Sequence, residues 1–179
     1  MDERLSLTYR LLPDLAETGS HQEAEGVLLL DHLYRGPQRF DLKDGITYTV
    51  GFTNSGGGVV LRGLAHAAGS SECARCLEDA AFDVEGAVEG YFILNPTEKE
   101  IENSDDEFTA VGRDGIIDLK APVIAAIIFE LPQILLCKDD CAGLCQKCGE
   151  NLNLMTCGCG QGPDPDHPFA ALKVLIDNT

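Results

Sequence analysis

The sequence is poor in positive charge. Its 179 residues include 13 Lys and Arg against 30 Asp and Glu, which gives a formal net charge of −17, and no cluster of Lys or Arg is present. A protein that binds nucleic acid through the phosphates needs such clusters, because neutralising the backbone is what releases its counterions. The composition therefore argues against a nucleic-acid-binding protein of the usual kind.

A long apolar segment and an export signal are also missing. The longest nearly continuous apolar stretch, 121–136, is interrupted by two prolines, Glu130 and Gln133, so it predicts no membrane span. The start, Met1-Asp2-Glu3-Arg4, has neither the basic residues nor the apolar run of a secretory signal. We therefore expect a cytoplasmic protein whose thiols are kept reduced.

The patterns that identify common enzymes are absent as well. The three glycines at 56–58 are followed by no phosphate-loop pattern and are explained by a hairpin turn. Ser70 and Ser71 have no recognisable His and Asp partners. The four histidines show no metal-ligand spacing among themselves and are interpreted as surface or packing residues: His21, His32, His66 and His167. We expect no enzymatic activity.

The apolar residues that are present predict an α+β fold. Short segments with alternating or β-branched residues predict an antiparallel β-sheet of four or five strands, or a partly open barrel: 25–32, 46–53, 59–67 and 82–91, with a short addition at 116–119. Beyond Asp118, a fair N-cap, the stretch 123–131 is apolar on every side, which predicts a buried central helix ended by Pro132. A last helix is expected at 168–176.

The length suits one domain with an appendage. We expect an α+β domain over 1–136 that includes an acidic loop at 95–113, followed at 137–179 by a cysteine-rich zinc-binding segment that ends in a helix. No internal repeat is evident. Residues 76–118 hold 13 acidic and two basic residues, most densely at 98–107. This stretch is either a solvated loop or a docking strip for a basic partner.

Eight cysteines in a reducing compartment favour metal binding over disulfides. Cys145 and Cys148 form a Cys-x-x-Cys turn whose backbone amides can point at the sulfurs, and Gly149 can supply the positive φ required after it. Cys157 and Cys159 follow closely enough to return to the same ion. We therefore predict one local zinc site from these four cysteines.

The other four cysteines suggest a second zinc site. Cys73 and Cys76 lie at the junction of two predicted strands, and Cys137 and Cys141 lie just past the predicted helix, about sixty residues away. A metal ion there would cross-link the sheet to the end of the helix. Other pairings, and a single ion with four free cysteines, remain open. The expected cofactor is thus one or two structural Zn²⁺ ions.

Three other interpretations of the cysteines compete with structural zinc. Cys141, Cys145 and Cys148 match the C-x3-C-x2-C spacing of radical-SAM iron–sulfur enzymes, but those enzymes need a large barrel for which no room follows. A thioredoxin-like role for Cys73 and Cys76 would need a βαβ unit where strands are predicted. A zinc-dependent redox-sensing chaperone, in which oxidation releases the metal, stays as an alternative.

The sequence also resembles the YceD family of bacterial proteins associated with accumulation of 23S ribosomal RNA. The resemblance spans roughly 60–176 and rests on ordered pieces, of which Gly143-Leu144-Cys145-Gln146-Lys147-Cys148-Gly149 followed by Asn151-Leu152-Asn153 is the most specific. The other pieces are Cys73-Ala74-Arg75-Cys76-Leu77, Ile117-Asp118-Leu119, Glu130-Leu131-Pro132 and the remainder of 137–159. Where the family often carries Asp-Pro-Arg, this chain has Asp166-His167-Pro168, and some members lack several of the cysteines.

The resemblance implies a role in ribosome biogenesis without catalysis. Two zinc sites with four thiolates each would lower the net charge to about −21, which disfavours phosphate-led contact with RNA. We therefore expect the partner to be a basic large-subunit ribosomal protein or a pre-ribosomal particle, with 98–107 as the steering surface. Direct RNA contact and the oligomeric state are left open by the sequence.

Overall fold

The computed structural model describes residues 7–11, 13–94, 109–111 and 115–159. Among these residues, no helix is both long and apolar enough to cross a bilayer. The elements in chain order are β1 (Thr8–Arg10), the 3-10 helix η2 (Pro13–Ala16), β2 (His21–Leu28), β3 (His32–Arg35), β4 (Gln38–Leu42), β5 (Ile46–Asn54), β6 (Gly58–Glu72), β7 (Asp79–Leu94), β8 (Thr109–Val111), β9 (Ile116–Asp118) and α2 (Lys120–Glu130).

A mostly antiparallel sheet dominates the fold, as the alternating pattern predicted, but it has seven strands where four or five were expected. The two longest strands, β6 and β7, pair along their whole lengths from Gly58↔Ile93 to Glu72↔Asp79. Both β5 and β4 pair antiparallel with β6 over successive parts of its length. Beyond them, β2 pairs with β5, β3 pairs with β4, and β8 joins β7 in parallel. The long β6–β7 hairpin therefore forms the backbone of the sheet, and its turn lies at Cys73.

The β3–β4 hairpin was not predicted. The sequence pattern favoured one strand over 25–32, whereas the structure ends β2 at Leu28 and begins β3 at His32. Gly36 turns the chain between β3 and β4 with φ +59°. Polar residues occupy much of both strands, which hides their alternation, so the sheet has more strands than the four or five expected.

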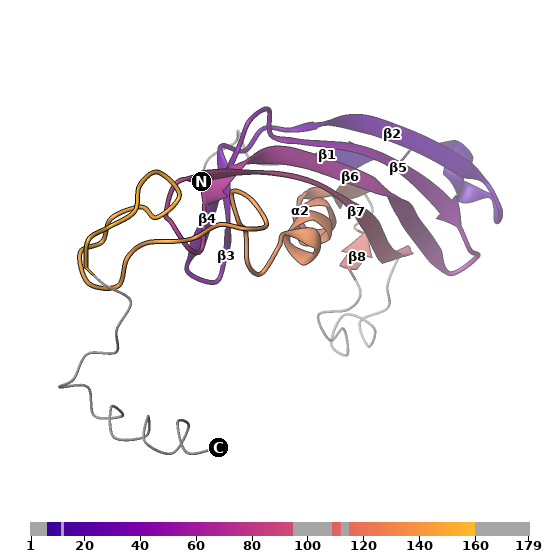
Figure 1. Ribbon diagram of the computed structural model, residues 1–179. Helices are drawn as coiled ribbons and strands as arrows, with labels where there is room; N and C mark the ends of the chain where they lie inside the picture. The colour runs from indigo at the N-terminus through magenta and orange to yellow at the C-terminus, as the bar shows by residue number, and fades with distance from the viewer. Residues whose placement is uncertain (1–6, 12, 95–108, 112–114, 160–179) are drawn as a thin grey trace, which may run out of the picture.

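The sheet buries one face and leaves the other open. Buried side chains on the inner face include Phe40, Ile46, Phe52, Leu61 and Val88. Figure 1 shows the sheet curving over α2, which lies against this inner face. No described element covers the opposite, outer face of β2, β5, β6 and β7, whose alternate residues are exposed.

Helix α2 is buried on one side, not on every side as predicted. Val123, Ala126 and Ile127 are buried, whereas Phe129 is 82% exposed. The helix lies so close to β7 that a Cβ added to Gly86 would collide with the carbonyl oxygen of Ala126. One sheet covers one side of the helix, and the described residues supply no second layer.

The residues before α2 form a small separate ribbon. Strand β9 pairs with β1 rather than with the large sheet. The ring of Tyr9 stacks on Phe52 with centroids 4.7 Å apart, which attaches the ribbon to the inner face. The predicted N-cap, Asp118, accepts a hydrogen bond from the Lys120 N–H at 2.9 Å, although the cap position itself falls on Leu119.

Residues 131–159 continue from α2 beyond the β3–β4 end of the sheet (orange to yellow in Figure 1). They contain six of the eight cysteines. The predicted helix at 168–176 and the dense acidic stretch 98–107 lie outside the described residues.

Candidate metal centres

The structure gathers the eight cysteine sulfurs into two groups of four. Within each group, all Sγ atoms lie within 4.8 Å of one another, close enough to hold a metal ion. The buried cluster is Cys73, Cys76, Cys137 and Cys141, and the exposed cluster is Cys145, Cys148, Cys157 and Cys159. These are the two sets that the spacing of the cysteines suggested. The described part of the chain holds no other group of three or more metal-ligating side chains this close together.

The buried cluster lies where the β6–β7 hairpin meets the segment after α2. Cys73, Cys76 and Cys141 are buried, and Cys137 is exposed at the edge. The Sγ atoms of Cys73 and Cys141 are 3.8 Å apart, and those of Cys76 and Cys137 are 3.6 Å apart. Four sulfurs bound tetrahedrally at about 2.3 Å would be separated by about 3.8 Å. The side chains therefore already have the spacing that a tetrahedral ion requires.

Backbone and side-chain hydrogen bonds join the two halves of the buried cluster. Ala74 donates its N–H to the carbonyl of Leu135 at 2.8 Å, and Leu144 donates to the carbonyl of Arg75 at 3.1 Å. The Arg75 guanidinium donates to the carbonyl of Cys141 at 2.9 Å. The turn between β6 and β7 is thus fixed to the residues that carry the distant cysteines.

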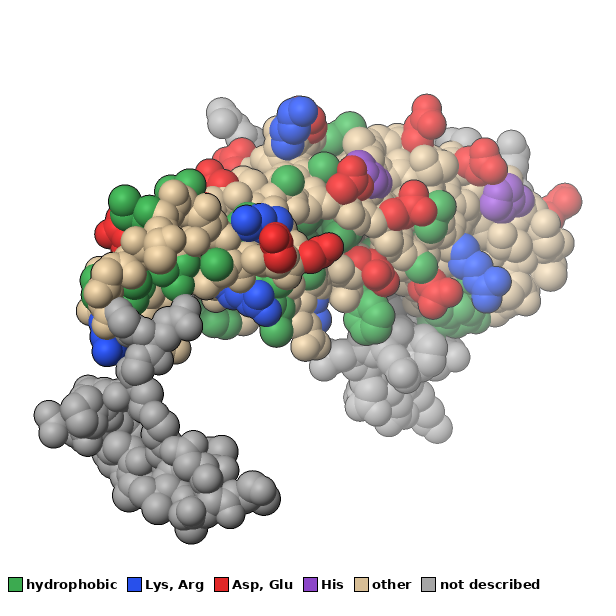
Figure 2. Space-filling model, viewed as in Figure 1, with side chains coloured by type: hydrophobic (Ala, Val, Ile, Leu, Met, Phe, Trp, Pro, Cys, Tyr) green, Lys and Arg blue, Asp and Glu red, His purple; other side chains and the backbone are tan. Residues whose placement is uncertain are grey.

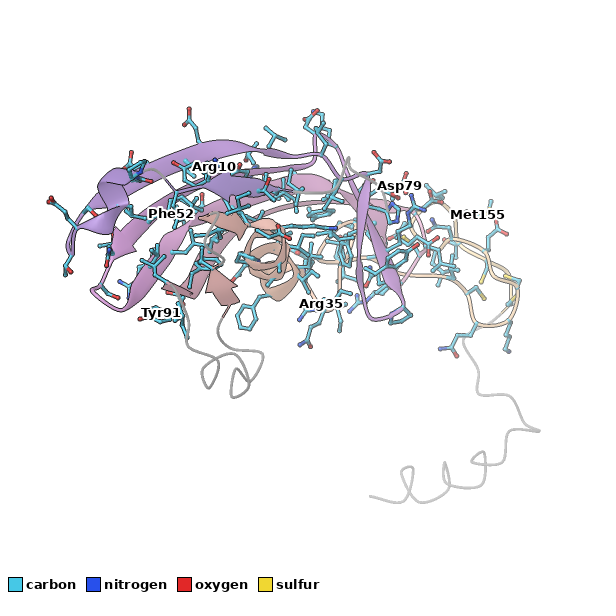
Figure 3. All side chains as sticks on the ribbon, turned by 180° about the vertical axis from the view of Figure 1, so that it is seen from behind. Arg10, Arg35, Phe52, Asp79, Tyr91 and Met155 are labelled. Atoms are coloured by element: carbon cyan, nitrogen blue, oxygen red, sulfur yellow. The ribbon has the colours of Figure 1, made fainter. Side chains whose placement is uncertain are left out.

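The exposed cluster is built within a single short segment. Cys148 and Cys159 are exposed, while Cys145 and Cys157 are partly covered. Figure 3 shows sulfur atoms in the loops near Met155, at the same end of the molecule as Asp79 and far from Phe52 and Tyr91. Only local chain surrounds these sulfurs in the described structure.

Both clusters begin with the same six-residue turn, although no internal repeat was apparent in the sequence. In Cys73–Glu78 the N–H of Cys73 donates to the carbonyl of Glu78 at 2.8 Å and Leu77 donates to Cys73 at 3.0 Å. In Cys145–Glu150 the two equivalent bonds are both 2.8 Å. Only three of the six residues are identical between the turns, Cys, Cys and Glu, which is too little to reveal a repeat by sequence alone.

The two turns match further in their flanking contacts. Glu72↔Asp79 closes the first hairpin, and the bridge Leu144↔Asn151 closes the second at the same offsets from the cysteines. The basic residue in the third position of each turn donates to the carbonyl of the last cysteine of its own cluster. Arg75 does so at 2.9 Å and Lys147 at 3.4 Å, to Cys159.

A positive φ follows the second cysteine in each turn. Gly149 has φ +75°, as predicted, and Leu77 has φ +62°. Leu77 is the only residue other than glycine with a positive φ among the described residues, and its side chain is 59% exposed. In the turn Cys73–Glu78, the turn geometry therefore overrides the ordinary preference of leucine for a negative φ.

Backbone amides favour ionisation of the first thiol in each turn. Burial raises the pKa of Cys73, but N–H groups of Arg75, Cys137 and Cys76 outweigh it and lower that pKa to about 6. The N–H groups of Cys148 and Lys147 lower the pKa of Cys145 to about 6 in the same way. The first thiolate of each cluster is thus stabilised by the fold itself.

One exposed thiol in each cluster, Cys137 in the buried cluster and Cys159 in the exposed cluster, behaves in the opposite way. Desolvation of its sulfur and the neighbouring Cys76 raise the pKa of Cys137 to about 12, although the residue as a whole is exposed. Cys148, followed by desolvation, raises the pKa of Cys159 to about 12. Several negative sulfurs this close together repel one another unless a cation lies between them. A bound metal cation would supply that charge.

Sequence reasoning missed the residues that support the clusters. Asn153 donates from Nδ2 to the Sγ of Cys141 at 3.3 Å, and Arg75 and Lys147 contact cysteine carbonyls as described above. The repeated spacing of a basic residue between each pair of cysteines was the available signal. The described histidines lie away from both clusters. His66 pairs with Asp83 at 2.7 Å, and His21 contacts Thr53 at 3.0 Å.

In the described part of the chain, a curved sheet, one α-helix and two four-cysteine clusters define a cysteine-rich α+β protein that could bind metal ions. The family model described as "Large ribosomal RNA subunit accumulation protein YceD" matches residues 61–176, which include all eight cysteines. The chain therefore belongs to the YceD family.

Curated relatives come from mycobacteria. An uncharacterized protein of Mycobacterium tuberculosis strain H37Rv is 38% identical over 94 residues, which cover 51% of this chain and 44% of that protein. An uncharacterized protein of Mycobacterium leprae is 33% identical over 112 residues, covering 62% and 46% respectively. The match spans less than half the length of these relatives. No solved structure gives a significant match.

Proposed function

We propose that this protein is a non-enzymatic ribosome-biogenesis factor that supports accumulation of 23S ribosomal RNA and assembly of the large subunit. The chain belongs to a family whose description is large ribosomal RNA subunit accumulation, and this membership supports the proposed role in ribosome biogenesis. The acidic outer face of the sheet, described below, supports the mode of action, which is to bind a basic large-subunit ribosomal protein or a pre-ribosomal particle that exposes one.

In this proposal the two cysteine clusters hold structural Zn²⁺. Thiolate sulfur is a preferred ligand of zinc, and four thiolates complete its tetrahedral shell. A closed shell leaves no open position for a substrate or an activated water. The ions would therefore stabilise the β6–β7 turn and the segment 137–159 without taking part in a reaction.

The outer face of the sheet carries the proposed docking surface. Its alternate positions are exposed along β2, β4, β6 and β7. Acidic residues predominate at these positions: Glu23, Glu25, Asp41, Glu72, Asp79, Asp83, Glu85 and Glu89. The Lys and Arg residues at such positions in the same strands are Arg39 and Arg62. Figure 2 shows Asp and Glu side chains spread over the sheet with few Lys or Arg among them.

Several of these carboxylates are available to a partner. Glu25, Glu85 and Glu89 form no ion pair with another described residue, whereas Arg39 is already paired with Asp41 at 2.6 Å. An ordered, negatively charged face attracts a basic protein and repels the phosphates of RNA. The acidic stretch 98–107 would extend the same attraction.

The experiment measures association of the zinc-loaded chain with purified basic large-subunit ribosomal proteins at low and high salt. We expect binding that weakens strongly as salt rises, because the attraction is screened. The double variant Glu85→Gln/Glu89→Gln should bind more weakly, mainly through a slower association rate. A variant in which the acids of 98–107 are replaced by their amides should weaken binding independently.

The matched control is Asp139→Asn/Glu150→Gln, which removes the same charge from exposed positions in the segment after α2. It should bind like the unmodified chain. Binding that ignores salt, or that responds equally to both double variants, would refute the outer face as the docking surface. Tight binding to a 23S RNA fragment with no ribosomal protein present would favour direct RNA contact instead.

A second candidate function, the zinc-dependent redox-sensing chaperone, rests on the exposure of Cys148 and Cys159. Solvent-accessible thiolates are the ones that peroxide oxidises most readily. This candidate requires reversible loss of zinc together with newly exposed apolar surface, and dye binding before and after peroxide treatment tests it.

A further inference from the structure

The motif Asn151-Leu152-Asn153 has no part in the proposed docking surface, yet its side chains lie between the two cysteine clusters. Asn153 follows the turn of the exposed cluster by only three residues beyond Glu150. Its Nδ2 donates to the Sγ of Cys141, a member of the buried cluster, at 3.3 Å. A side chain carried by one cluster thus contacts a sulfur of the other.

Further hydrogen bonds fix the orientation of this amide. The Oδ1 of Asn153 accepts the N–H of Ala142 at 2.8 Å, so its Nδ2 must be the atom that faces the sulfur. The Oδ1 of Asn151 accepts two hydrogen bonds from Asn153, one from its backbone N–H at 3.0 Å and one from its Nδ2 at 2.9 Å. Asn153 is therefore held in one rotamer with a donor directed at Cys141.

The backbone that carries Asn153 depends on the turn of the exposed cluster. Leu144 and Asn151 form an isolated bridge across that turn, and Leu152 donates its N–H to the carbonyl of Gly143 at 2.9 Å. Cys145 and Glu150 are joined within the same hairpin. If the exposed cluster loosens, the position of Asn153 relative to Cys141 is lost with it.

We propose that Asn153 is a positioning residue for the metal ion of the buried cluster and that it couples the affinities of the two clusters. The inference rests on the metal sites of the proposed function and goes beyond them. An N–H directed at a metal-bound thiolate stabilises its negative charge, and such outer-shell partners are worth about 10- to 100-fold in metal affinity. Because coupling between two binding sites is reciprocal, each ion should strengthen the binding of the other.

The test uses the full chain loaded with zinc and a competing chromogenic chelator. Asn153→Asp keeps an oxygen for the Ala142 N–H but replaces the donor to Cys141 with a carboxylate oxygen. We expect zinc affinity of the buried cluster to fall about 10- to 100-fold. The matched control is Gln146→Glu, which adds the same charge at an exposed position of the same hairpin and leaves the hydrogen bonds of Asn153 in place. Its affinity should stay close to that of the unmodified chain.

The spectroscopic readout is cadmium-113 NMR of the chain loaded with that metal. Asn153→Asp should shift the resonance of the buried cluster more than that of the exposed cluster, because the lost hydrogen bond ends on Cys141. A role confined to overall folding would move both resonances together or neither.

Coupling is tested by emptying the exposed cluster with Cys148→Ser/Cys159→Ser. In the chain that retains Asn153, we expect the buried cluster to bind zinc more weakly than in the two-ion protein. In the Asn153→Asp background, the same double substitution should have little further effect, since the connection is already broken.

Three outcomes would overturn parts of this account in distinguishable ways. Fewer than two zinc ions in the unmodified chain would contradict the proposed metal sites, and the inference with them. Two ions with equal affinities in Asn153→Asp and Gln146→Glu would overturn the positioning role alone. Full additivity of Asn153→Asp and the exposed-cluster variant would overturn the coupling.

Discussion

The buried and exposed clusters use the same six-residue turn in different surroundings. In the buried cluster the turn closes the longest hairpin of the sheet, and its partner Cys137 lies 61 residues beyond Cys76. In the exposed cluster, Cys157 lies only nine residues beyond Cys148, and no described strand is involved. The same local geometry therefore serves once as a long-range cross-link and once as a local fold.

This difference bears on how much each cluster stabilises the protein. A link between distant parts of the chain removes much more freedom from the unfolded state than a link across a few residues. Three of the four cysteines in this cluster, Cys73, Cys76 and Cys141, are also buried. We therefore expect the two clusters to differ in stability contribution, in metal exchange and in tolerance to substitution.

The largest expected effect is on global stability. Cys73→Ser/Cys76→Ser should lower the free energy of unfolding of the zinc-loaded chain by about 4 kcal/mol or more, since loss of a metal site is among the largest single causes of destabilisation. Cys145→Ser/Cys148→Ser should cost less than half as much. Urea denaturation under reducing conditions measures both. Equal losses would contradict the difference drawn between the clusters.

The next largest expected difference between the two clusters is in the rate at which they lose zinc. A chelator should remove zinc from the exposed cluster about tenfold faster, because opening that site disturbs fewer contacts and a tenfold ratio needs only about 1.4 kcal/mol. Stopped-flow absorbance should show two phases, of which Cys148→Ser/Cys159→Ser removes the fast one. A single phase, or loss of the slow phase in that variant, would be inconsistent with the assignment.

A smaller difference in stability is expected between variants of Arg75 and Lys147, the basic residue of each turn. Arg75→Ala removes a 2.9 Å hydrogen bond to Cys141 and should cost about 1–2 kcal/mol. Lys147→Ala removes a longer, exposed contact to Cys159 and should change stability by less than about 0.5 kcal/mol. Thermal unfolding of the zinc-loaded variants provides the comparison, and a larger loss for Lys147→Ala would reverse the expected order.

The smallest effect concerns the residue after each turn. Gly149→Ala should cost about 1 kcal/mol, because φ +75° is unfavourable for a residue with a Cβ. Leu77→Gly relieves a similar strain but adds freedom to the unfolded chain, so its net effect should stay within about 0.5 kcal/mol. Denaturation midpoints distinguish the two. A strongly destabilising Leu77→Gly would mean that the exposed leucine side chain makes contacts important for stability.

The strands and the helix show how much of the fold the sequence pattern could predict. Alternation of apolar residues predicted both bounds of β5 and β7 within three residues, because one buried face imposes a period of two. The start of β6 was also predicted, but this strand continues five residues beyond its predicted end. The β3–β4 hairpin escaped notice because its residues are mostly polar. The prediction that α2 is buried on every side was wrong. An apolar helix can face either a second layer of structure or solvent, and its amino-acid composition does not distinguish these two cases.

For the candidate site, spacing alone pointed to the turns. A Cys-x-x-Cys pair followed by glycine specifies its own hydrogen bonds within six residues, so the conformation of Cys145–Glu150 follows from local sequence. The equivalent turn with Leu77 was less evident because leucine rarely adopts a positive φ. Asn153 could not be found in this way, since its contact with Cys141 depends on how two separate segments pack.

The sequence by itself determined the features that depend on neighbouring residues: the alternating strands, the two cysteine turns and the excess of negative charge. Only the tertiary structure decided that Cys73 and Cys76 meet Cys137 and Cys141, that the acidic positions share one open face, and that an amide from one cluster contacts a sulfur of the other. The reason is physical. Local hydrogen bonds and periodicity depend on a few adjacent residues, whereas closure of a sixty-residue loop depends on the packing of all the strands and the helix between its ends.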